Sequence, residues 1–241
     1  MIIIKKKQSF LKATQKWFPE IIRLRDFLSI TMYKQVDCHI KSPFVFIKEK
    51  SFTLQTNLTQ PIEDIFKKFS ATIRNELRRT EKEDSTYTYN EKPDVFLSIF
   101  NDFAIQKGLT CQTNESLNAF GSNLVLTSIA INGLITAVHS YLIDSDLKKV
   151  RLLHSATLRF SDNLDSNMIA RSNKYLHYMD LKRFKAESFE IYDWGGISVG
   201  SDDKSLLGIN KFKESLGGEL IEQANLYSPL YYLILKLFKS A

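Results

Sequence analysis

Four side chains in the second half of the chain could carry acid–base or electrostatic chemistry. They are His154, Arg159, Asp193 and Lys213. An imidazole can take up a proton, while a guanidinium or ammonium ion stabilises negative charge that develops on a substrate. Each of them also has a purely structural interpretation, and the choice between the two interpretations depends on the elements that position these residues.

His154 lies inside the apolar run 150–160, where strand alternation puts it on the same face as Ala156 and Leu158. A core histidine with one hydrogen bond is slightly favoured here over a general base. Arg159 comes at the end of the run and is the better candidate for holding an anionic ligand.

Asp193 ends the next apolar run and is followed by Gly195 and Gly196. The missing side chains of two glycines would let a ligand approach backbone N–H groups. The alternative is a turn aspartate that bonds its own backbone. Tyr192 is either a proton donor or a half-buried strand aromatic, and the second interpretation is favoured. Lys213 is either the cation of a site or an ordinary solvated lysine.

The elements that must position these residues follow an α/β order. Three apolar runs, 121–130, 134–143 and 150–160, are separated by turn residues, of which Asn132-Gly133 is a strong hairpin signal, so an antiparallel meander is expected. The predicted order continues with a loop over 161–172, a helix over 173–187 and a strand over 189–194. It ends with a helix over 206–216, a strand over 219–226 and a helix over 229–239. The strands flanking the helix 173–187 are expected to be parallel.

The first half is predicted to be partly helical. We expect a helix within residues 1–30, short strands at 43–47 and 51–56, and a helix at 93–107 ended by Gly108. The clearest pattern is an amphipathic helix over 61–83, because apolar residues recur there every three or four positions.

The polar face of the predicted helix 61–83 carries a basic stripe of Lys67, Arg74 and Arg78. This stripe is either a solvated face or a surface for a phosphate-bearing ligand. We predict two segments, 1–110 with this basic helix and 111–241.

Charge and composition set further limits. Residues 1–60 hold 11 basic and 4 acidic side chains, so most of the net charge of +6 lies there. Two cysteines without a partner spacing fit a reducing compartment. There is no signal-peptide pattern and no stretch long enough to span a membrane, so a cytoplasmic protein is expected. No residues have metal-ligand spacing, and no metal is implied.

Three C-terminal motifs resemble the signature of Fem-like proteins, a branch of the GNAT acyltransferase superfamily that includes FemAB-like acetyltransferases. They are the helix that begins Asn173-Lys174-Tyr175, the step Tyr192-Asp193-Trp194-Gly195-Gly196, and Gly208-Ile209-Asn210-Lys211-Phe212-Lys213 followed by Gly217-Gly218. The segment 71–79 resembles the basic helix of these proteins. The resemblance spans about residues 58–228, and residues 1–57 match weakly.

The resemblance implies a GNAT-like fold with a mixed, mostly antiparallel sheet in which two parallel strands splay apart, here 150–160 and 189–194. Segments 1–110 and 111–241 would be two GNAT-like halves, although 241 residues are few for two complete ones. Donor phosphates would lie at a helix start, which maps to Arg171, Ser172 and Asn173.

An acyl-CoA donor such as acetyl-CoA normally requires a glycine loop, and residues 161–172 contain no glycine. Fem-like ligases instead use aminoacyl-tRNA and also lack that loop. The donor therefore stays open between the two.

The function implied is acyl transfer to an amine on a sugar nucleotide or a cell-envelope precursor such as that of peptidoglycan or another polysaccharide. In this interpretation Lys213, Asp193, His154 and Arg159 are catalytic, and Gly195 and Gly196 help to bind the donor. Tyr192 and the basic stripe would contact the substrate. The alternative is a non-catalytic module that uses the basic helix to bind RNA or an acidic saccharide.

Overall fold

The computed structural model describes residues 1–8, 11–160 and 164–239, and divides the chain into two compact units that interleave in sequence. The first contains residues 1–53, 196–207 and 220–241, and the second contains residues 54–195 and 208–219. The predicted segments 1–110 and 111–241 stay a prediction.

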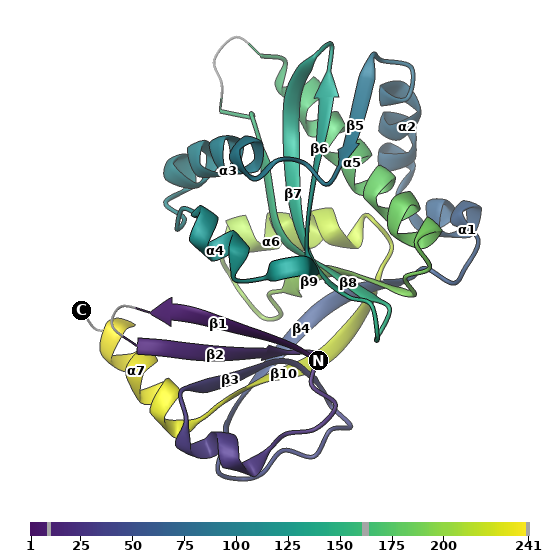
Figure 1. Cartoon of the computed structure of the whole chain (residues 1–241). Coiled ribbons are helices and arrows are strands. Elements are labelled where there is room, and N and C mark those ends of the chain that lie inside the picture. Colours follow the sequence, from purple (N-terminus) through teal and green to yellow (C-terminus); the bar gives the residue numbers. More distant parts are fainter. Residues whose placement is uncertain (9–10, 161–163, 240–241) are drawn as a thin grey trace. The chain divides into compact units, whose positions relative to one another are not determined.

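The first unit is built on strands β1 (Ile2–Gln8), β2 (Leu11–Trp17), β3 (Thr31–Asp37) and β10 (Glu219–Tyr227), with the start of β4 (Ile47–Asn57) (Figure 1). β1 and β2 are antiparallel, β2 and β3 are parallel, and β10 runs antiparallel to β3. A short 3₁₀ helix, η1 (Leu24–Leu28), and the C-terminal helix α7 (Pro229–Lys239) pack against each other and belong to this unit.

The predicted helix within residues 1–30 is wrong. Ile2 and Ile4 are buried while Ile3 is exposed, so the apolar pattern has the period of a strand. The β-branched residues at this end favour a strand as well. Two further corrections follow: 43–47 and 51–56 are not two strands, because β4 is continuous, and β3 was missed.

The second unit is built on the strand order β4-β9-β8-β7-β6-β5, with β5 at Ser85–Tyr89, β6 at Leu124–Ile131, β7 at Leu134–Asp144, β8 at Lys149–Thr157 and β9 at Ile191–Ile197. The predicted antiparallel meander is confirmed as β6, β7 and β8. The predicted parallel pair is confirmed as β8 and β9, joined by helix α5 (Ser166–Ala186). β5 and the short helix α4 (Asn114–Asn118) were not predicted.

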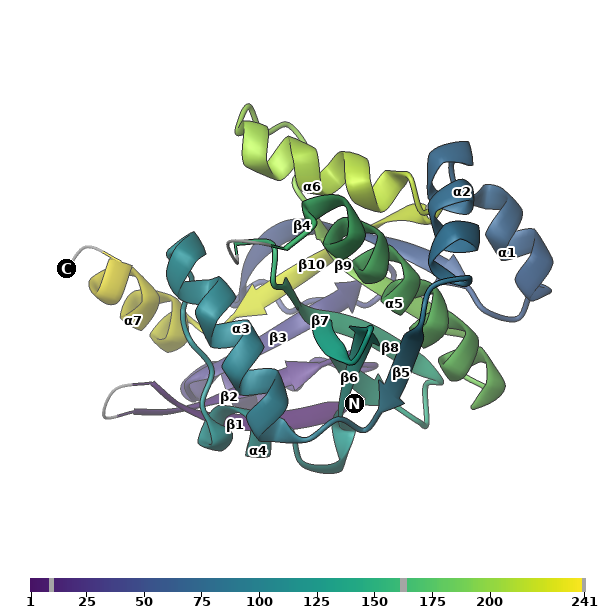
Figure 2. The same ribbon diagram turned by 90° about the horizontal axis from the view of Figure 1, so that it is seen from above.

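Helices cover both faces of this sheet (Figure 2). Val138 of β7 packs on helix α3 (Pro93–Lys107), whereas its neighbour His139 bonds to Asp180 of α5. Because successive side chains of a strand point to opposite faces, α3 and α5 lie on opposite sides of β7. Gly108 ends α3 in the left-handed conformation, as predicted.

The predicted basic helix is two helices, α1 (Ile62–Lys68) and α2 (Ala71–Thr80). The apolar face is as predicted, since Ile65, Phe69, Ile73 and Leu77 are all buried. Ser70 nevertheless starts a new helix, because its side chain accepts a hydrogen bond from the Ile73 N–H.

Helix α6 (Lys204–Glu214) follows β9, and both span the boundary between the units. Its end, β10 and α7 agree with the sequence prediction. No helix in the described part of the chain is long and apolar enough to cross a membrane.

Candidate active site

The candidate site lies in the second unit where the parallel strands β8 and β9 stop pairing. They pair at three positions, Lys149 with Ile191, Val150 with Tyr192 and Arg151 with Asp193. β8 then carries a bulge opposite Ser140 and Tyr141 of β7, and it runs six residues past the last pair with β9. The two strands therefore stop sharing a ladder at this point, as expected of a splayed pair.

Asp193 is fully buried at this point and is held by three donors. Its Oδ1 accepts hydrogen bonds from the Arg151 guanidinium and from the Gly195 N–H, both at 2.8 Å. Its Oδ2 accepts one from the Gln55 amide at 3.1 Å. The carboxylate is therefore fixed in place and paired with the Arg151 guanidinium, which makes it an anchor for nearby cations.

Lys213 brings a second cation to the same place. Its Nζ lies 3.3 Å from the point that a Cβ on Gly195 would occupy. Burial, and next the charge of Arg151, lower the pKa of Lys213 to about 8, while the charge of Asp193 acts in the opposite direction. The ammonium is thus only partly desolvated and is still the main form at neutral pH.

Gly195 explains how a lysine can approach the strand so closely. Its φ is +87°, and a Cβ there would also lie 3.4 Å from the Leu152 carbonyl oxygen. Both the conformation and the space favour glycine. Gly196 has ordinary φ, and its Cβ would meet nothing closer than 3.9 Å, so this reasoning applies to Gly195 alone. Both glycines lie within β9 rather than after it, which corrects the predicted strand end.

The glycines after α6 fix the position of that helix. A Cβ on Gly217 would lie 2.5 Å from the Lys68 carbonyl oxygen, and one on Gly218 would lie 2.7 Å from Leu54 Cγ. The Ser70 N–H donates to the Ser215 carbonyl at 2.8 Å. The end of α6 therefore touches the α1–α2 junction directly, and this contact places Lys213.

A buried polar network lies between α5 and the sheet. The Asp180 carboxylate, fully buried, accepts hydrogen bonds from Tyr87 at 2.9 Å and Tyr141 at 2.6 Å, and lies 2.8 Å from His139 Nδ1. Burial, and then the charge of Asp180, raise the pKa of Tyr141, so its hydroxyl stays a donor. Each of these polar side chains is held by a hydrogen bond within the network, as the burial of polar groups requires.

The network extends from Tyr141 toward the site through Tyr192 and His177. The hydroxyls of Tyr141 and Tyr192 are 2.7 Å apart, and the Tyr192 hydroxyl is 3.5 Å from His177 Nδ1. His177 also packs on the ring of Phe212, next to Lys213. Burial, the charge of His139 and that of Lys213 lower the pKa of His177, so this imidazole is neutral. Tyr192 is fully buried in β9 rather than half-buried, and its assignment as a substrate contact stays a prediction.

His154 and Arg159 lie apart from these contacts. His154 Nδ1 is 2.7 Å from the Ser140 hydroxyl, and its ring packs against Phe100 of α3 at 4.9 Å between centroids. The side chain is half-buried, and the assignment of His154 as a catalytic residue stays a prediction. The Arg159 guanidinium lies over the ring of Phe160 at 5.1 Å.

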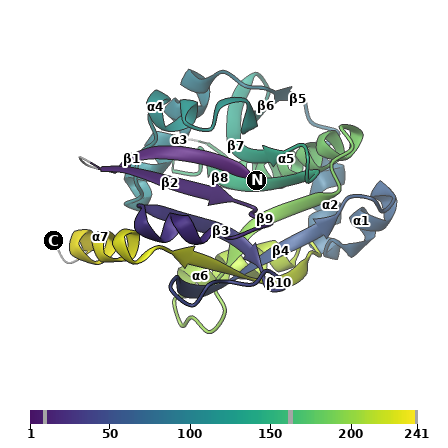
Figure 3. The same cartoon turned by 60° about the horizontal axis from the view of Figure 1, so that its bottom comes forward.

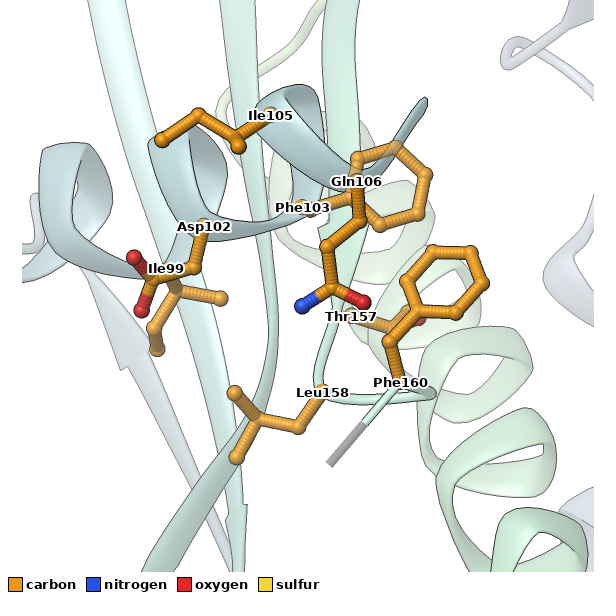
Figure 4. Close-up of a pocket in the computed structure, with 8 residues that line it drawn as sticks. All are labelled: Ile99, Asp102, Phe103, Ile105, Gln106, Thr157, Leu158 and Phe160. Atoms are coloured by element: carbon orange, nitrogen blue, oxygen red, sulfur yellow. The ribbon is translucent and has the colours of Figure 1, made fainter. Parts of the chain in front are cut away.

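A pocket of about 200 Å³ opens between α3 and the end of β8 (Figure 4). Ile99, Phe103, Leu158 and Phe160 supply apolar walls, and Asp102, Ile105, Gln106 and Thr157 complete the lining. Arg159 stands next to two of these walls, since its guanidinium also lies 5.9 Å from the ring of Phe103. Its assignment as an anion-binding residue stays a prediction.

Arg171, Ser172 and Asn173 were predicted to lie at the start of a helix. That prediction is wrong, because α5 begins at Ser166. Asp165 caps it by accepting from the Asn167 N–H at 2.9 Å. The three residues lie inside the helix and their backbone N–H groups are not free. Residues 161–163 of the expected loop lie outside the described residues.

Their side chains have structural partners instead. Arg171 pairs with Glu83 at 2.9 Å, the Ser172 hydroxyl is 2.8 Å from that of Thr136, and Asn173 Oδ1 is 3.0 Å from His139 Nε2. As donor-binding residues they stay predictions.

The true start of α5 borders another pocket, of about 400 Å³. Asn75, Glu76, Arg79, Asp165, Asn167 and Arg171 line it. The Nε of Arg171 is buried without a hydrogen-bond partner among the described residues. The guanidinium groups of Arg79 and Arg171 both pair with Glu83, and they share this lining with the carboxylates of Glu76 and Asp165.

The basic stripe is divided between α1 and α2. Arg74 donates hydrogen bonds to the carbonyls of Lys67, at 3.0 Å, and of Phe69, so it closes the end of α1. Lys67 is exposed and pairs with Asp64 at 2.8 Å, and the Arg78 guanidinium lies over the ring of Phe66. Arg74 has a structural task, while Lys67 and Arg78 lie at the surface.

Within the described residues, no group of three or more His, Cys, Asp or Glu side chains could hold a metal ion. Neither protein-family models nor curated proteins match the sequence.

Solved structures do match. FemX superposes with a TM-score of 0.69 at 10% identity, over 98% of this chain and 85% of FemX. L-PGS from Bacillus licheniformis gives 0.58 at 13% identity, over 99% and 86%. The C-terminal domain of a putative lysylphosphatidylglycerol synthetase from Agrobacterium fabrum gives 0.55 at 14%, over 84% and 71%. The chain thus has a GNAT-like fold of the Fem type.

Proposed function

We propose that this protein is an acyltransferase that moves an aminoacyl group from a tRNA ester to an amine of a cell-envelope or sugar-nucleotide precursor. One observation carries the proposal. A partly buried lysine, Lys213, meets the fixed Asp193–Arg151 pair where β8 and β9 stop pairing. The proposal is supported by the fold shared with FemX and with lysylphosphatidylglycerol synthetase.

The chemistry assigns one role to each charged group. The acceptor amine attacks the ester carbonyl, a C–N bond forms, and negative charge builds on the carbonyl oxygen. The C–O bond then breaks, and the leaving hydroxyl ends with a proton that the amine has lost. The Lys213 ammonium stabilises the oxyanion, and the Asp193 carboxylate, which Arg151 fixes in place, attracts this ammonium. Its pKa of about 8 keeps it protonated at neutral pH.

Two observations favour aminoacyl-tRNA over acyl-CoA. Residues 161–172 contain no glycine, so a glycine loop that would let coenzyme A phosphates approach the backbone is missing. The second is the pocket at the start of α5, where Arg79 and Arg171 could contact the phosphates of a nucleic acid backbone beside Glu76 and Asp165. Acetyl-CoA remains the competing donor, and both donors belong to the cytoplasm.

A parallel donor assay tests the proposal. Purified protein is incubated with an amine-bearing UDP-sugar or peptide precursor and either a mixture of aminoacyl-tRNAs or acetyl-CoA, and products are identified by mass spectrometry. We expect a product with aminoacyl-tRNA that depends on Lys213 and survives in Lys211→Met, the exposed neighbour on α6. Product with acetyl-CoA alone would show that acetyl-CoA, and not aminoacyl-tRNA, is the donor. No product with either donor would contradict the proposal.

The alternative of a non-catalytic RNA- or saccharide-binding module rests on the basic surface of α1 and α2. A variant with Lys67, Arg78 and Arg79 changed to Ala leaves the structural Arg74 intact. Weaker tRNA binding and a flatter salt dependence are expected if this surface contacts phosphates. tRNA binding without any transfer would favour the module over the enzyme.

A further inference from the structure

The first unit exposes an unusual number of large apolar side chains. Of the sixteen that are exposed in the described part of the chain, eleven belong to this smaller unit. Single exposed apolar residues are normal, but a group of them on adjoining elements indicates an interaction surface.

Helices η1 and α7 adjoin each other (Figure 3), and six of the eleven residues belong to these helices or to the segment just before η1. Leu230, Leu233 and Leu237 form a stripe along α7, with 43%, 55% and 63% of their surface exposed. Ile21, Leu24 and Leu28 line η1 and the segment before it, with 70%, 62% and 81% exposed. We call these six residues the leucine patch.

The other face of α7 explains why the helix does not turn the leucines inward. Tyr231 and Ile234 are buried, and Tyr231 packs with Met32 and Tyr227 in the core of the unit. The core face of the helix is thus already occupied by other apolar residues. The leucine stripe is a second apolar face, which nothing in the described chain covers.

Cations surround the leucine patch. Arg23 and Arg25 are exposed beside Leu24, and Lys236 is exposed between Leu233 and Leu237. Three acidic residues lie near these elements: Glu20 is exposed, Glu49 accepts a hydrogen bond from the Tyr227 hydroxyl, and Asp26 is engaged by Lys16 at 2.5 Å and by the Tyr33 hydroxyl. The local charge is positive, in line with the basic excess of residues 1–60.

We infer that the leucine patch docks the protein on an anionic lipid surface, with the leucines in the acyl boundary and the cations at the headgroups. Short amphipathic helices with basic flanks bind membranes in this way without spanning them. Tyr232, half-buried and 4.9 Å from Lys236 Nζ at its ring centroid, suits the headgroup layer.

A second copy of the chain fits the patch less well. A two-fold contact would bring the same surface of both copies together and so gather two sets of Arg23, Arg25 and Lys236 in one interface. Like charges would then be desolvated together, whereas anionic headgroups neutralise them. The inference does not depend on the proposed function, because it rests on this surface alone.

Co-sedimentation of the full chain with vesicles tests the inference. We compare phosphatidylcholine vesicles with vesicles that also contain phosphatidylglycerol. Binding to the anionic vesicles, weakened by salt, is expected for the wild type. Leu233→Gln/Leu237→Gln should lower the partition coefficient at least about tenfold, since both leucines are exposed and the fold should be kept. An unchanged unfolding midpoint verifies the fold.

Two matched variants complete the design. Ile105→Gln/Leu109→Gln changes equally exposed residues at the end of α3 in the second unit and should bind like the wild type. Arg23→Gln/Arg25→Gln should lose the preference for anionic vesicles. Absence of wild-type binding, equal binding by the leucine variant, or a dimer that the leucine variant abolishes without any vesicle binding would each overturn the inference.

Discussion

Lys213 owes its lowered pKa mainly to burial, which penalises its charged form, and this penalty is also a cost to stability. The pKa in the folded state, about 8, is below the ordinary value of 10.5 that applies in the unfolded state. Below pH 8 the lysine is charged in both states, so the full cost is present. Between pH 8 and 10.5 the unfolded state binds more protons, so the cost disappears as the pH rises.

Lys213→Met should therefore raise the free energy of unfolding at pH 7, by up to about 3 kcal/mol, and the gain should shrink toward pH 10. Urea unfolding of both proteins at several pH values measures this. The exposed Lys211→Met serves as control and should show no such pH dependence. A stability difference between wild type and Lys213→Met that stays constant with pH would contradict the burial of a charged lysine.

Alanine substitutions at Gly195 and Gly196 distinguish the glycine that is required for its backbone conformation from the one that is not. Gly195→Ala forces an L-residue into a φ of +87° and puts a methyl group 3.3 Å from Lys213 Nζ, which should cost roughly 1–3 kcal/mol and displace the lysine. Gly196→Ala should stay within about 1 kcal/mol of the wild type, because its Cβ has room. Denaturant unfolding of the pair checks this, and equal behaviour of the two variants would show the reasoning wrong.

At the scale of elements, the contact between α6 and the α1–α2 junction sets the position of Lys213. Gly217→Ala would drive a Cβ into the Lys68 carbonyl at 2.5 Å, and because backbone cannot yield as a side chain does, we expect a loss of about 2 kcal/mol or more. The same change at Gly208, in the middle of α6 with open space around it, should stabilise the helix by about 0.5–1 kcal/mol.

Thermal unfolding of Gly217→Ala and Gly208→Ala gives both effects on one helix. A Gly217→Ala variant as stable as the wild type would mean that the end of α6 does not touch Lys68. Lys213 would then be positioned by some other contact.

Elements with a strong period were predictable, and elements that depend on partners were not. The meander of β6, β7 and β8 follows from β-branched runs and the Asn132-Gly133 turn. The split at Ser70 and the early start of α5 depend on caps, and the Asp165-Ser166 pair was the available signal for the second. β5 is polar and is held as a strand by pairing with β6, which no local pattern reveals.

At the scale of the whole molecule, the site was predictable in part. Asp193, Gly195 and Lys213 were named from the sequence, and the structure brings them together. Arg151 and Gln55 were missed because their meeting with Asp193 depends on strand register. Asp180 was also missed, although a carboxylate on the apolar face of a predicted helix was a usable signal.

The candidates that the structure did not bring to Lys213 have in common the way in which they were predicted. His154 was chosen by its strand and Arg171 by an assumed helix start, and neither choice used a three-dimensional partner. His154 faces the aromatic rings of α3, and Arg171 bonds to Glu83 within the α2–α5 packing. Sequence spacing places a residue on a face, but contacts between distant elements decide its role.

Steady-state kinetics of Lys213→Met, with the donor and acceptor found in the parallel assay, tests the central claim most directly. The variant keeps the length of the side chain and removes the charge. The account predicts an intact fold, a Michaelis constant close to that of the wild type, and a turnover number lower by about 10²-fold or more. Lys211→Met should retain full turnover. A Lys213→Met protein that turns over at nearly the wild-type rate would contradict the account.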